Sequence, residues 1–415
     1  MRDEMKKVPR LRFRGFQDDW EHRKLDDSIK VMDGDRGANY PHDTDFFKDG
    51  DTLFLDTGNV TKNGFKFDSV KYITNEKDEQ LRAGKLEKND FVLTSRGTLG
   101  NVGFYDEVVY NLHPKIRINS AMLILRNTDE QLSYSYLHTL LKGQLISDFM
   151  KKNQVGSAQP HITKSEFLKL NLNVPCNINE QNKIGNFFKS LDVTITLHQR
   201  KLEQLKELKK AYLQVMFPEK DERVPKLRFA DFEEEWELCK LGKLAEFNPK
   251  SNLPEKFEYV DLESVVGTEL VGHRLENRDS APSRAQRLAK KNDVFYQTVR
   301  PYQKNNYLFD LPYDNYVFST GYAQMRPSGN GYFLLTLVQE EKFVNRVLER
   351  STGTSYPAIS SNDLAKLSVR VPADIEEEQN IGKFFSNLDN LVTLHQNKLT
   401  QLKSLKKSYL QNMFI

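Results

Sequence analysis

The chain repeats itself, and this repeat constrains its architecture more than any other feature of the sequence. Residues 8–25, VPRLRFRGFQDDWEHRKL, return at 224–241 as VPKLRFADFEEEWELCKL, an offset of 216. Residues 184–217 return at 381–414 with an offset of 197, and more than half of the paired positions are identical. The chain is therefore a tandem duplication, and each half of about 200 residues is long enough to bury a core of its own.

The two halves have diverged unevenly. The two offsets differ by 19 residues (216 against 197), so the region between the repeated segments is shorter in the second half. Weaker echoes survive in this region. They are Asn89-Asp90 with Asn292-Asp293, Thr94-x-Arg96 with Thr298-x-Arg300, and GSAQPHIT at 156–163 with GTSYPAIS at 353–360. The pattern predicts two related globular heads of different length, each followed by a retained segment.

The retained segments predict long helices over 177–217 and 374–415, with a coiled-coil seam of three-then-four spacing. A helix of about 38 residues is about 57 Å long, and an apolar stripe of that length needs a partner. The other copy is the obvious partner, and a helix packed on its own head is the alternative. The predicted seam contains Leu191, His198, Leu202, Leu205, Tyr212, Leu388, His395, Leu399, Leu402 and Tyr409. Its two histidines are interpreted as polar interface positions rather than ligands.

The two heads, 1–176 and 236–373, are predicted to be mixed α/β domains. Short β-type runs such as TLFLDTG, DFVLTS and DNYVFSTGYAQM lie between turn residues. Amphipathic helices are predicted at 131–151 and 331–350, and the charged, proline-bounded stretch 218–235 is predicted to be a linker. The expected fold class is α+β, in which two long paired helices separate the two heads of a pseudo-twofold internal repeat.

Motifs of self-contained catalysis are missing from the sequence. It contains no GxxxxGK phosphate loop, no complete GxGxxG, no HExxH and no Cys/His ligand spacing. We therefore expect a chain that acts by binding, with no catalytic residues, no metal site and no bound cofactor. A nuclease whose carboxylates are hidden in loops and a scaffold that binds only proteins are the alternatives.

Basic residues gather locally, although the net charge is only +3. Residues 273–304 contain eight Arg and Lys residues and only three acidic residues. The first head has a basic residue in a glycine-rich turn at 94–105. Such side chains neutralise phosphates and reach base edges, whereas a solvated charged face is the alternative. The predicted DNA contacts are Lys62, Arg96, Gly97, Thr98, Arg284, Arg287, Thr298, Arg300, Tyr302, Gln303 and Lys304.

Cysteine usage and hydropathy predict a cytoplasmic protein. Cys176 and Cys239 lie far apart and form no CxxC pair, which fits a reducing compartment. The charged start, MRDEMKK, is unlike a signal peptide, and no apolar run approaches the ~18 residues that a membrane span needs. No membrane partner is expected.

The layout resembles the DNA-specificity subunit of type I restriction-modification systems. Each half opens with a VPxLRFxxFxxxW run and closes its head with GSxQPxIS-like and EQxxIGxFFxxLD-like runs. The second head also carries APSRAQR, TVRPYQK and FSTGYAQMRP. The resemblance covers almost the whole chain, from Val8 to Phe414.

This resemblance implies a role for each part. The heads would be target-recognition domains that read the two halves of an asymmetric, bipartite site in double-stranded DNA. The helices would pair antiparallel as a spacer and hold two methyltransferase (modification) subunits, which restriction/motor subunits then join. S-adenosylmethionine, ATP and Mg²⁺ would belong to these partners, and the complex would act in a bacterial cytoplasm.

One repeated loop has two interpretations. Gln159-Pro160-His161 and Tyr356-Pro357-Ala358 lie just before the last strand expected in each head. The first interpretation is a loop near DNA, and the alternative is a turn that packs the head on its helix.

Overall fold

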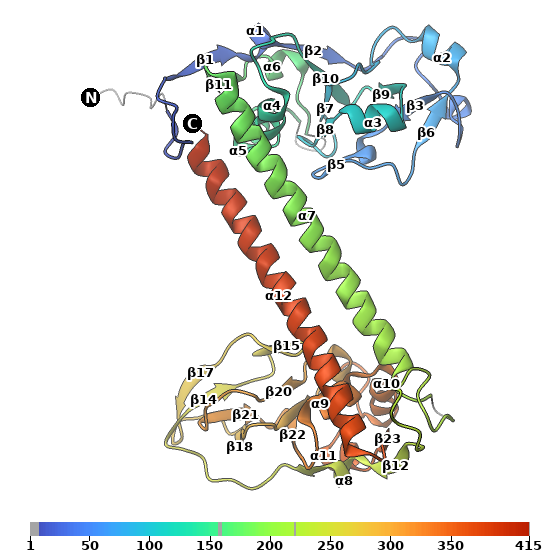
Figure 1. Ribbon diagram of the computed structural model, residues 1–415, viewed down its shortest axis with the longest axis vertical. Helices are drawn as coiled ribbons and strands as arrows, with labels where there is room; N and C mark the ends of the chain where they lie inside the picture. The colour runs from blue at the N-terminus through green and yellow to red at the C-terminus, as the bar shows by residue number, and fades with distance from the viewer. Residues whose placement is uncertain (1–7, 157–159, 220, 415) are drawn as a thin grey trace. The chain divides into compact units, whose positions relative to one another are not determined.

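The computed structural model describes residues 8–156, 160–219 and 221–414 (Figure 1). It forms two compact units, Met1–Leu197 with Lys398–Ile415, and His198–Asn397. Each unit contains one head and a piece of both long helices, which are α7 (Ile178–Val215) and α12 (Ile375–Met413). The predicted helices are thus present, with ends within two residues of those expected. In the described part of the chain, no helix has the length and apolar character of a membrane span.

The described residues of the first head form a four-stranded sheet, a three-stranded sheet and two two-stranded sheets. The four-stranded sheet has the order β2-β10-β7-β8 and is antiparallel, and the three-stranded sheet has the order β6-β3-β9, in which β3 and β9 are parallel. Strand β1 pairs with β11, which joins the start of the head to the strand before α7. The strands are β1 (Trp20–Lys24), β2 (Ile29–Asp33), β3 (Thr52–Leu55), β4 (Val60–Thr61), β5 (Gly64–Phe65), β6 (Lys71–Ile73), β7 (Phe91–Thr94), β8 (Val102–Phe104), β9 (Ile116–Ile118), β10 (Met122–Asn127) and β11 (Asn171–Pro175).

The second head repeats this topology. Its first sheet has the order β13-β22-β19-β20, and its second, β17-β14-β21-β18, keeps a parallel pair, β14 with β21, and adds β18 at one edge. The predicted repeat therefore extends through the diverged heads. The strands are β12 (Glu237–Lys240), β13 (Ala245–Phe247), β14 (Lys256–Val260), β15 (Val265–Val266), β16 (Glu269–Leu270), β17 (Arg274–Asn277), β18 (Ala285–Leu288), β19 (Val294–Gln297), β20 (Tyr307–Leu308), β21 (Tyr316–Ser319), β22 (Tyr322–Pro327) and β23 (Ser368–Val371).

Each helix that the sequence predicts inside a head is two helices. The segment 131–151 forms α4 (Tyr134–Leu141) and α5 (Gln144–Asn153), and 331–350 forms α9 (Gly331–Gln339) and α10 (Glu341–Arg350). The breaks are extended residues, Gly143 (φ −82, ψ 178) and Glu340 (φ −61, ψ 135). The single-helix prediction was wrong because apolar spacing continues across one extended residue. The short helices are α1 (Leu25–Ser28), α2 (Asn75–Gln80), α3 (Glu107–Leu112), α6 (Lys164–Phe167), α8 (Leu241–Leu244) and α11 (Ser361–Ala365).

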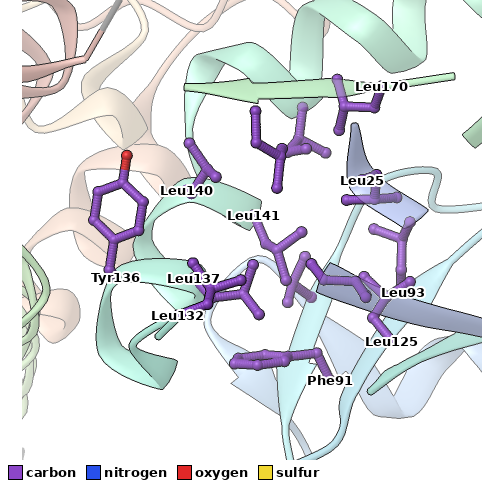
Figure 2. Close-up of a cluster of buried hydrophobic side chains, with 14 of the residues drawn as sticks. Leu25, Phe91, Leu93, Leu125, Leu132, Tyr136, Leu137, Leu140, Leu141 and Leu170 are labelled. Atoms are coloured by element: carbon purple, nitrogen blue, oxygen red, sulfur yellow. The ribbon is translucent and has the colours of Figure 1, made fainter. Parts of the chain in front are cut away.

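The antiparallel sheet of the first head is buried on both faces. Strand residues alternate between faces, and Phe91 and Leu93 of β7 join the core under α4, whereas Val92 joins a second core on the other side. Figure 2 shows Phe91, Leu93 and Leu125 converging with side chains of α4, among them Leu137. Burial on both faces explains why these strands are continuous apolar runs instead of alternating ones.

The long helices pair antiparallel within each unit. In the second unit, His198 Nδ1 lies 3.0 Å from His395 Nδ1, and Tyr212 packs on Phe384 with ring centroids 4.9 Å apart. Residue numbers thus rise along one helix as they fall along the other. The seam leucines, each less than 10% exposed, are Leu191, Leu202, Leu205, Leu388, Leu399 and Leu402. Tyr212, Tyr409 and the two histidines are half-buried. The predicted fold class is confirmed.

Polar contacts across this pairing also repeat. Lys209 forms an ion pair with Asp389 at 2.6 Å in the second unit. Lys406 forms the corresponding pair with Asp192 in the first unit. The duplication therefore preserved charge pairing as well as the apolar seam.

Each head core is completed by residues that follow the helix of the other half. Phe217, two residues after the end of α7, packs on Trp236 of the second head with ring centroids 5.8 Å apart. Phe414, directly after α12, packs on Trp20 of the first head at 6.4 Å. The start of each helix also packs on its own head, since Phe188 is 1% exposed in the first core. Each long helix therefore pairs with the other long helix and also packs on its own head at its start.

The repeated LRF run holds an arginine that clamps the start of each long helix. The Arg12 guanidinium donates to both carboxylate oxygens of Glu180 at 2.6 and 2.8 Å. Arg228 donates to Glu377 in the same way at 2.7 and 2.8 Å. Both glutamates are fully buried. A two-pronged Arg–carboxylate pair is geometrically specific, which explains why the two motifs persist together.

The predicted linker, 218–235, is a packed part of the second unit where the structure describes it. The Leu227 N–H donates to the Val215 carbonyl at 2.9 Å, and Arg228 makes the clamp described above. Phe229 packs against the core of the second head. The composition of a linker is therefore misleading here, because a few spaced residues anchor the segment.

His138 makes the first unit sensitive to acid. Burial beside the Phe91 and Phe104 rings, reinforced by Lys142, lowers the pKa of His138 to about 4. The unfolded chain, with a His pKa near 6.5, therefore binds more protons than the folded chain between these values. The first unit is expected to lose up to about 3 kcal/mol of stability as the pH falls from about 6.5 to about 4.

Unfolding in denaturant at pH 7.5 and pH 5, followed by hydrogen exchange of the first unit, measures this loss. The variant His138→Phe removes the titrating group and should flatten the difference, whereas His22→Gln, at an exposed position, should not. An unchanged pH dependence in His138→Phe would contradict the assignment.

Candidate nucleic-acid interface

The basic turn of the first head, residues 94–101, joins β7 to β8. The Thr94 hydroxyl accepts from the Asn101 N–H at 2.9 Å and donates to the carbonyl of Thr98, which closes the turn. Gly97 has φ 70, a left-handed conformation that glycine adopts without steric cost. The closed turn presents Arg96, Gly97 and Thr98 at its tip, all three exposed, as a DNA contact would require.

The corresponding turn of the second head, 298–306, follows β19 and is also held by side-chain hydrogen bonds. Asn306 Oδ1 accepts from the Gln297 N–H at 2.8 Å, and Gln297 Nε2 donates to the Val299 carbonyl at 2.6 Å. Arg300 and Lys304 both have left-handed backbone, with φ 54 and 55. A non-glycine residue in this region is uncommon and costs energy, so the surrounding hydrogen bonds must hold it there.

The two repeated proline loops pack against these turns. In the first head, Val155 and His161 exchange backbone hydrogen bonds, and the Ile162 N–H donates to the Ser95 carbonyl at 3.0 Å. His161 also forms a backbone bridge with Arg96. Gln159 lies outside the described residues.

In the second head, Thr352 and Ala358 exchange backbone bonds of 2.9 Å, and the Pro357 carbonyl accepts from the Arg300 N–H at 2.7 Å. The Ile359 N–H donates to the Thr298 carbonyl at 3.0 Å. These bonds attach each proline loop to a basic turn, so the turn and the loop form one surface in each head. The contact of these loops with DNA stays a prediction.

The remaining predicted DNA contacts of the second head differ in accessibility. Arg284, directly before β18, is exposed, and Tyr302 is 49% exposed. Gln303 is exposed, but its Oε1 accepts from Gln297 at 2.9 Å. Arg287 is half-buried, and burial lowers the pKa of its guanidinium.

Two of the predicted contacts are already engaged within the chain. Thr298 is 6% exposed, and its hydroxyl donates to the Gly321 carbonyl at 2.8 Å. The prediction that Thr298 contacts DNA is therefore wrong for the chain as folded: the side chain braces the turn instead. Lys304 forms an ion pair with Glu341, so its charge is partly neutralised.

The structure also places two predicted contacts, Lys62 and Arg96, beside basic residues that were not among the predicted contacts. A hollow of about 340 Å³ beside Arg96 is lined by Arg36, His161 and Lys164. A second, of about 330 Å³, is lined by Lys62, Lys142 and Lys151. These residues come from distant parts of the first head, and no spacing in the sequence could have grouped them. Within the described residues, no group of three or more His, Cys, Asp or Glu side chains is arranged to hold a metal ion.

Comparison with known proteins gives one consistent result. A model of the "Type I restriction modification DNA specificity domain" matches residues 17–207 and again 233–404. The MjaVIII specificity subunit of a type I restriction enzyme from Methanocaldococcus jannaschii is 22% identical, over 94% of this chain and 91% of that protein. The HindI specificity subunit from Haemophilus influenzae is 24% identical over 196 residues. That match covers 44% of this chain and 41% of the relative, less than half of its length.

Among solved structures, the S subunit of a type I restriction-modification system from M. genitalium has the same fold. The TM-score is 0.66, with 15% sequence identity over 98% of this chain and 99% of that one. At this level of identity the likeness shows the fold alone.

Proposed function

Because this chain belongs to the type I restriction modification DNA specificity family, we propose that it selects the DNA sequence on which a restriction-modification complex acts. The observation that carries the proposal is the pair of equivalent surfaces, one in each head. Each consists of a basic turn, with Arg96 or Arg300, pinned to a proline loop. Neither the cryptic nuclease nor the protein-only scaffold is favoured by the family match.

The two surfaces share the same arrangement of turn and proline loop but carry different side chains, which supports an asymmetric, bipartite target. The first turn is glycine-rich, with Gly97 and Gly100 in left-handed conformations, whereas the second contains Pro301 and Tyr302. Identical heads would read identical half-sites, and unlike heads read unlike ones. Lys and Arg side chains around each surface would hold the duplex through its phosphates, in a salt-dependent way.

The long helices would set the distance between half-sites and dock the partner subunits. They expose apolar side chains outside the seam, and partner subunits would cover them on docking. These side chains are Val193, Leu197, Leu208, Leu391, Leu394 and Leu405, between 41% and 62% exposed. We propose that two methyltransferase subunits dock there and that restriction/motor subunits join them. S-adenosylmethionine, ATP and Mg²⁺ would bind to those partners, in the cytoplasm of a bacterium.

Exchanging one head tests the proposal. Replacing residues 20–175 with the corresponding head of another family member is expected to change one half of the methylated motif and leave the other half and the spacer as they were. Methylome sequencing of a host that expresses the chain with its modification subunits measures both halves. The matched control replaces 236–372 and should change the other half only.

Two results would contradict the proposal that each head recognises one half-site independently. One is a change in both halves after a single exchange. The other is a complete lack of binding to mixed duplex DNA at low salt when the modification subunits are present.

A further inference from the structure

Arg300 is held in an unusual position at the tip of the second head's basic turn. Its backbone is left-handed (φ 54, ψ 55), and Pro301 follows it directly. Its N–H donates to the Pro357 carbonyl at 2.7 Å, and its own carbonyl accepts from the Gln303 N–H at 3.0 Å. Local strain of this kind persists only where surrounding contacts enforce it, and it concentrates at functional sites.

The guanidinium of Arg300 lies over the ring of Tyr356, with Cζ 4.4 Å from the ring centroid. Tyr356 is 62% exposed and comes from the proline loop, so the stack is an open surface feature and not part of a core. An arginine plane stacked on an aromatic ring is oriented in advance, and its N–H groups on the plane's edge are free to point outward. Less rotamer freedom is then lost on binding.

The stacked guanidinium has no acidic partner. Within residues 8–156, 160–219 and 221–414, no hydrogen bond or ion pair engages the side-chain nitrogens of Arg300. The neighbouring basic residue, Lys304, is by contrast tied to Glu341. Arg300 is therefore a half-buried, positively charged fork that the Tyr356 ring positions and that has no hydrogen-bond partner among the described residues.

We propose that Arg300, positioned by Tyr356, reads a guanine in the half-site of the second head. The inference rests on the proposed function and adds the base that is recognised. A planar fork with two parallel N–H donors matches O6 and N7 of guanine in the major groove, and no other base presents two acceptors there. The same fork can also pair with two oxygens of a phosphate, and the selection below distinguishes the two contacts by whether the selected motif changes.

The first head lacks this platform among its described residues. The hydrogen bonds from Ile162 to Ser95 and from Ile359 to Thr298 align the left-handed Gly97, not Arg96, with Arg300. In the sequence, Gln159 stands at the place of Tyr356. The inference is therefore confined to the second half-site, and it predicts that guanine is fixed there at one position.

The test is a selection from duplexes randomised at both half-sites, using the full chain with its modification subunits. Wild type should enrich a bipartite motif with one fixed guanine in the half-site that follows the second head. Arg300→Ala should reduce the preference for that guanine by about 5- to 150-fold and leave every other position as it was. Placing 7-deazaguanine there, which lacks the N7 acceptor, should weaken binding of wild type but not of Arg300→Ala.

Three further variants separate reading from charge and from misfolding. Arg300→Lys keeps the positive charge without the planar guanidinium. It should still bind DNA but lose part of the preference for guanine. Tyr356→Ala removes the platform and should lower the same preference, with other positions unchanged. The matched control, Arg223→Ala, removes an exposed arginine that pairs with Glu235, and should select the wild-type motif.

Two outcomes would overturn the inference alone. In one, Arg300→Ala binds all sequences more weakly but selects the same motif, which would indicate a phosphate contact. In the other, wild type selects a second half-site without a fixed guanine. A wild-type complex that selects no motif would refute the proposed function, and this inference with it.

Discussion

Replacing Arg228 with alanine is expected to destabilise the second unit by about 3–5 kcal/mol, because the variant leaves the Glu377 carboxylate buried without a partner. Glu377 is fully buried, and Arg228 satisfies both of its oxygens. Hydrogen exchange of α9 and α10 (331–350) in increasing denaturant measures the loss in the second unit. Exchange of α4 and α5 (134–153) measures the first unit, which should keep its protection.

The control for Arg228→Ala lies in the same segment. Arg223 pairs with Glu235, but both side chains are at least 60% exposed, so Arg223→Ala should cost less than about 1 kcal/mol. Replacing Arg228 and Glu377 together with methionine removes the unpaired charge and should recover most of the loss. If Arg228→Ala proves no worse than Arg223→Ala, the clamp does not hold the unit together.

Replacing Phe217 with alanine is expected to cost about 3–5 kcal/mol, again in the second unit, because it removes a large ring from a packed core. Phe217 is 2% exposed and lies 5.8 Å from the Trp236 ring and 6.0 Å from the Phe333 ring. It belongs to the first half of the sequence, yet its loss should lower protection in α9. The same hydrogen-exchange experiment measures this change.

An exposed leucine on α7, the helix that precedes Phe217, serves as the control. Leu208 is 43% exposed, and Leu208→Ala should change stability by less than about 0.5 kcal/mol. Loss of protection in α4 and α5 of the first head, with α9 unchanged, would contradict the assignment of Phe217 to the core of the second head. The equivalent residue of the second half, Phe414, should act in the same way on the first head through Trp20.

The architecture could be predicted from the sequence because its signals are local and periodic. A seam that recurs every three and four residues over a long stretch, as from Leu191 to Tyr212, has one regular solution, a long helix with a partner. The duplication added the identity of that partner. The strands of the heads were also visible as short apolar runs between turn residues. The relative direction of the two long helices was harder to predict from the seam, since only contacts such as Tyr212 on Phe384 show that they are antiparallel.

The prediction failed where a local pattern fits two structures equally well. One extended residue, Gly143 or Glu340, turns an amphipathic stretch into two helices without disturbing its apolar spacing. Thr298 belongs to the polar TVRPYQK run but is buried, because its hydroxyl has a carbonyl partner more than 20 residues away. The polarity of a residue in the sequence does not show whether its side chain is free to bind a ligand or already hydrogen-bonded within the fold.

The sequence by itself determined that this chain has two heads, two paired helices and basic turns at equivalent places. Only the tertiary structure decided which distant residues meet. Arg300 meets Tyr356, and Arg228 meets Glu377, across separations for which no periodicity exists. The physical reason is that secondary structure follows from interactions a few residues apart, whereas a recognition surface is made by packing, which pairs groups by shape and charge and not by their order in the chain.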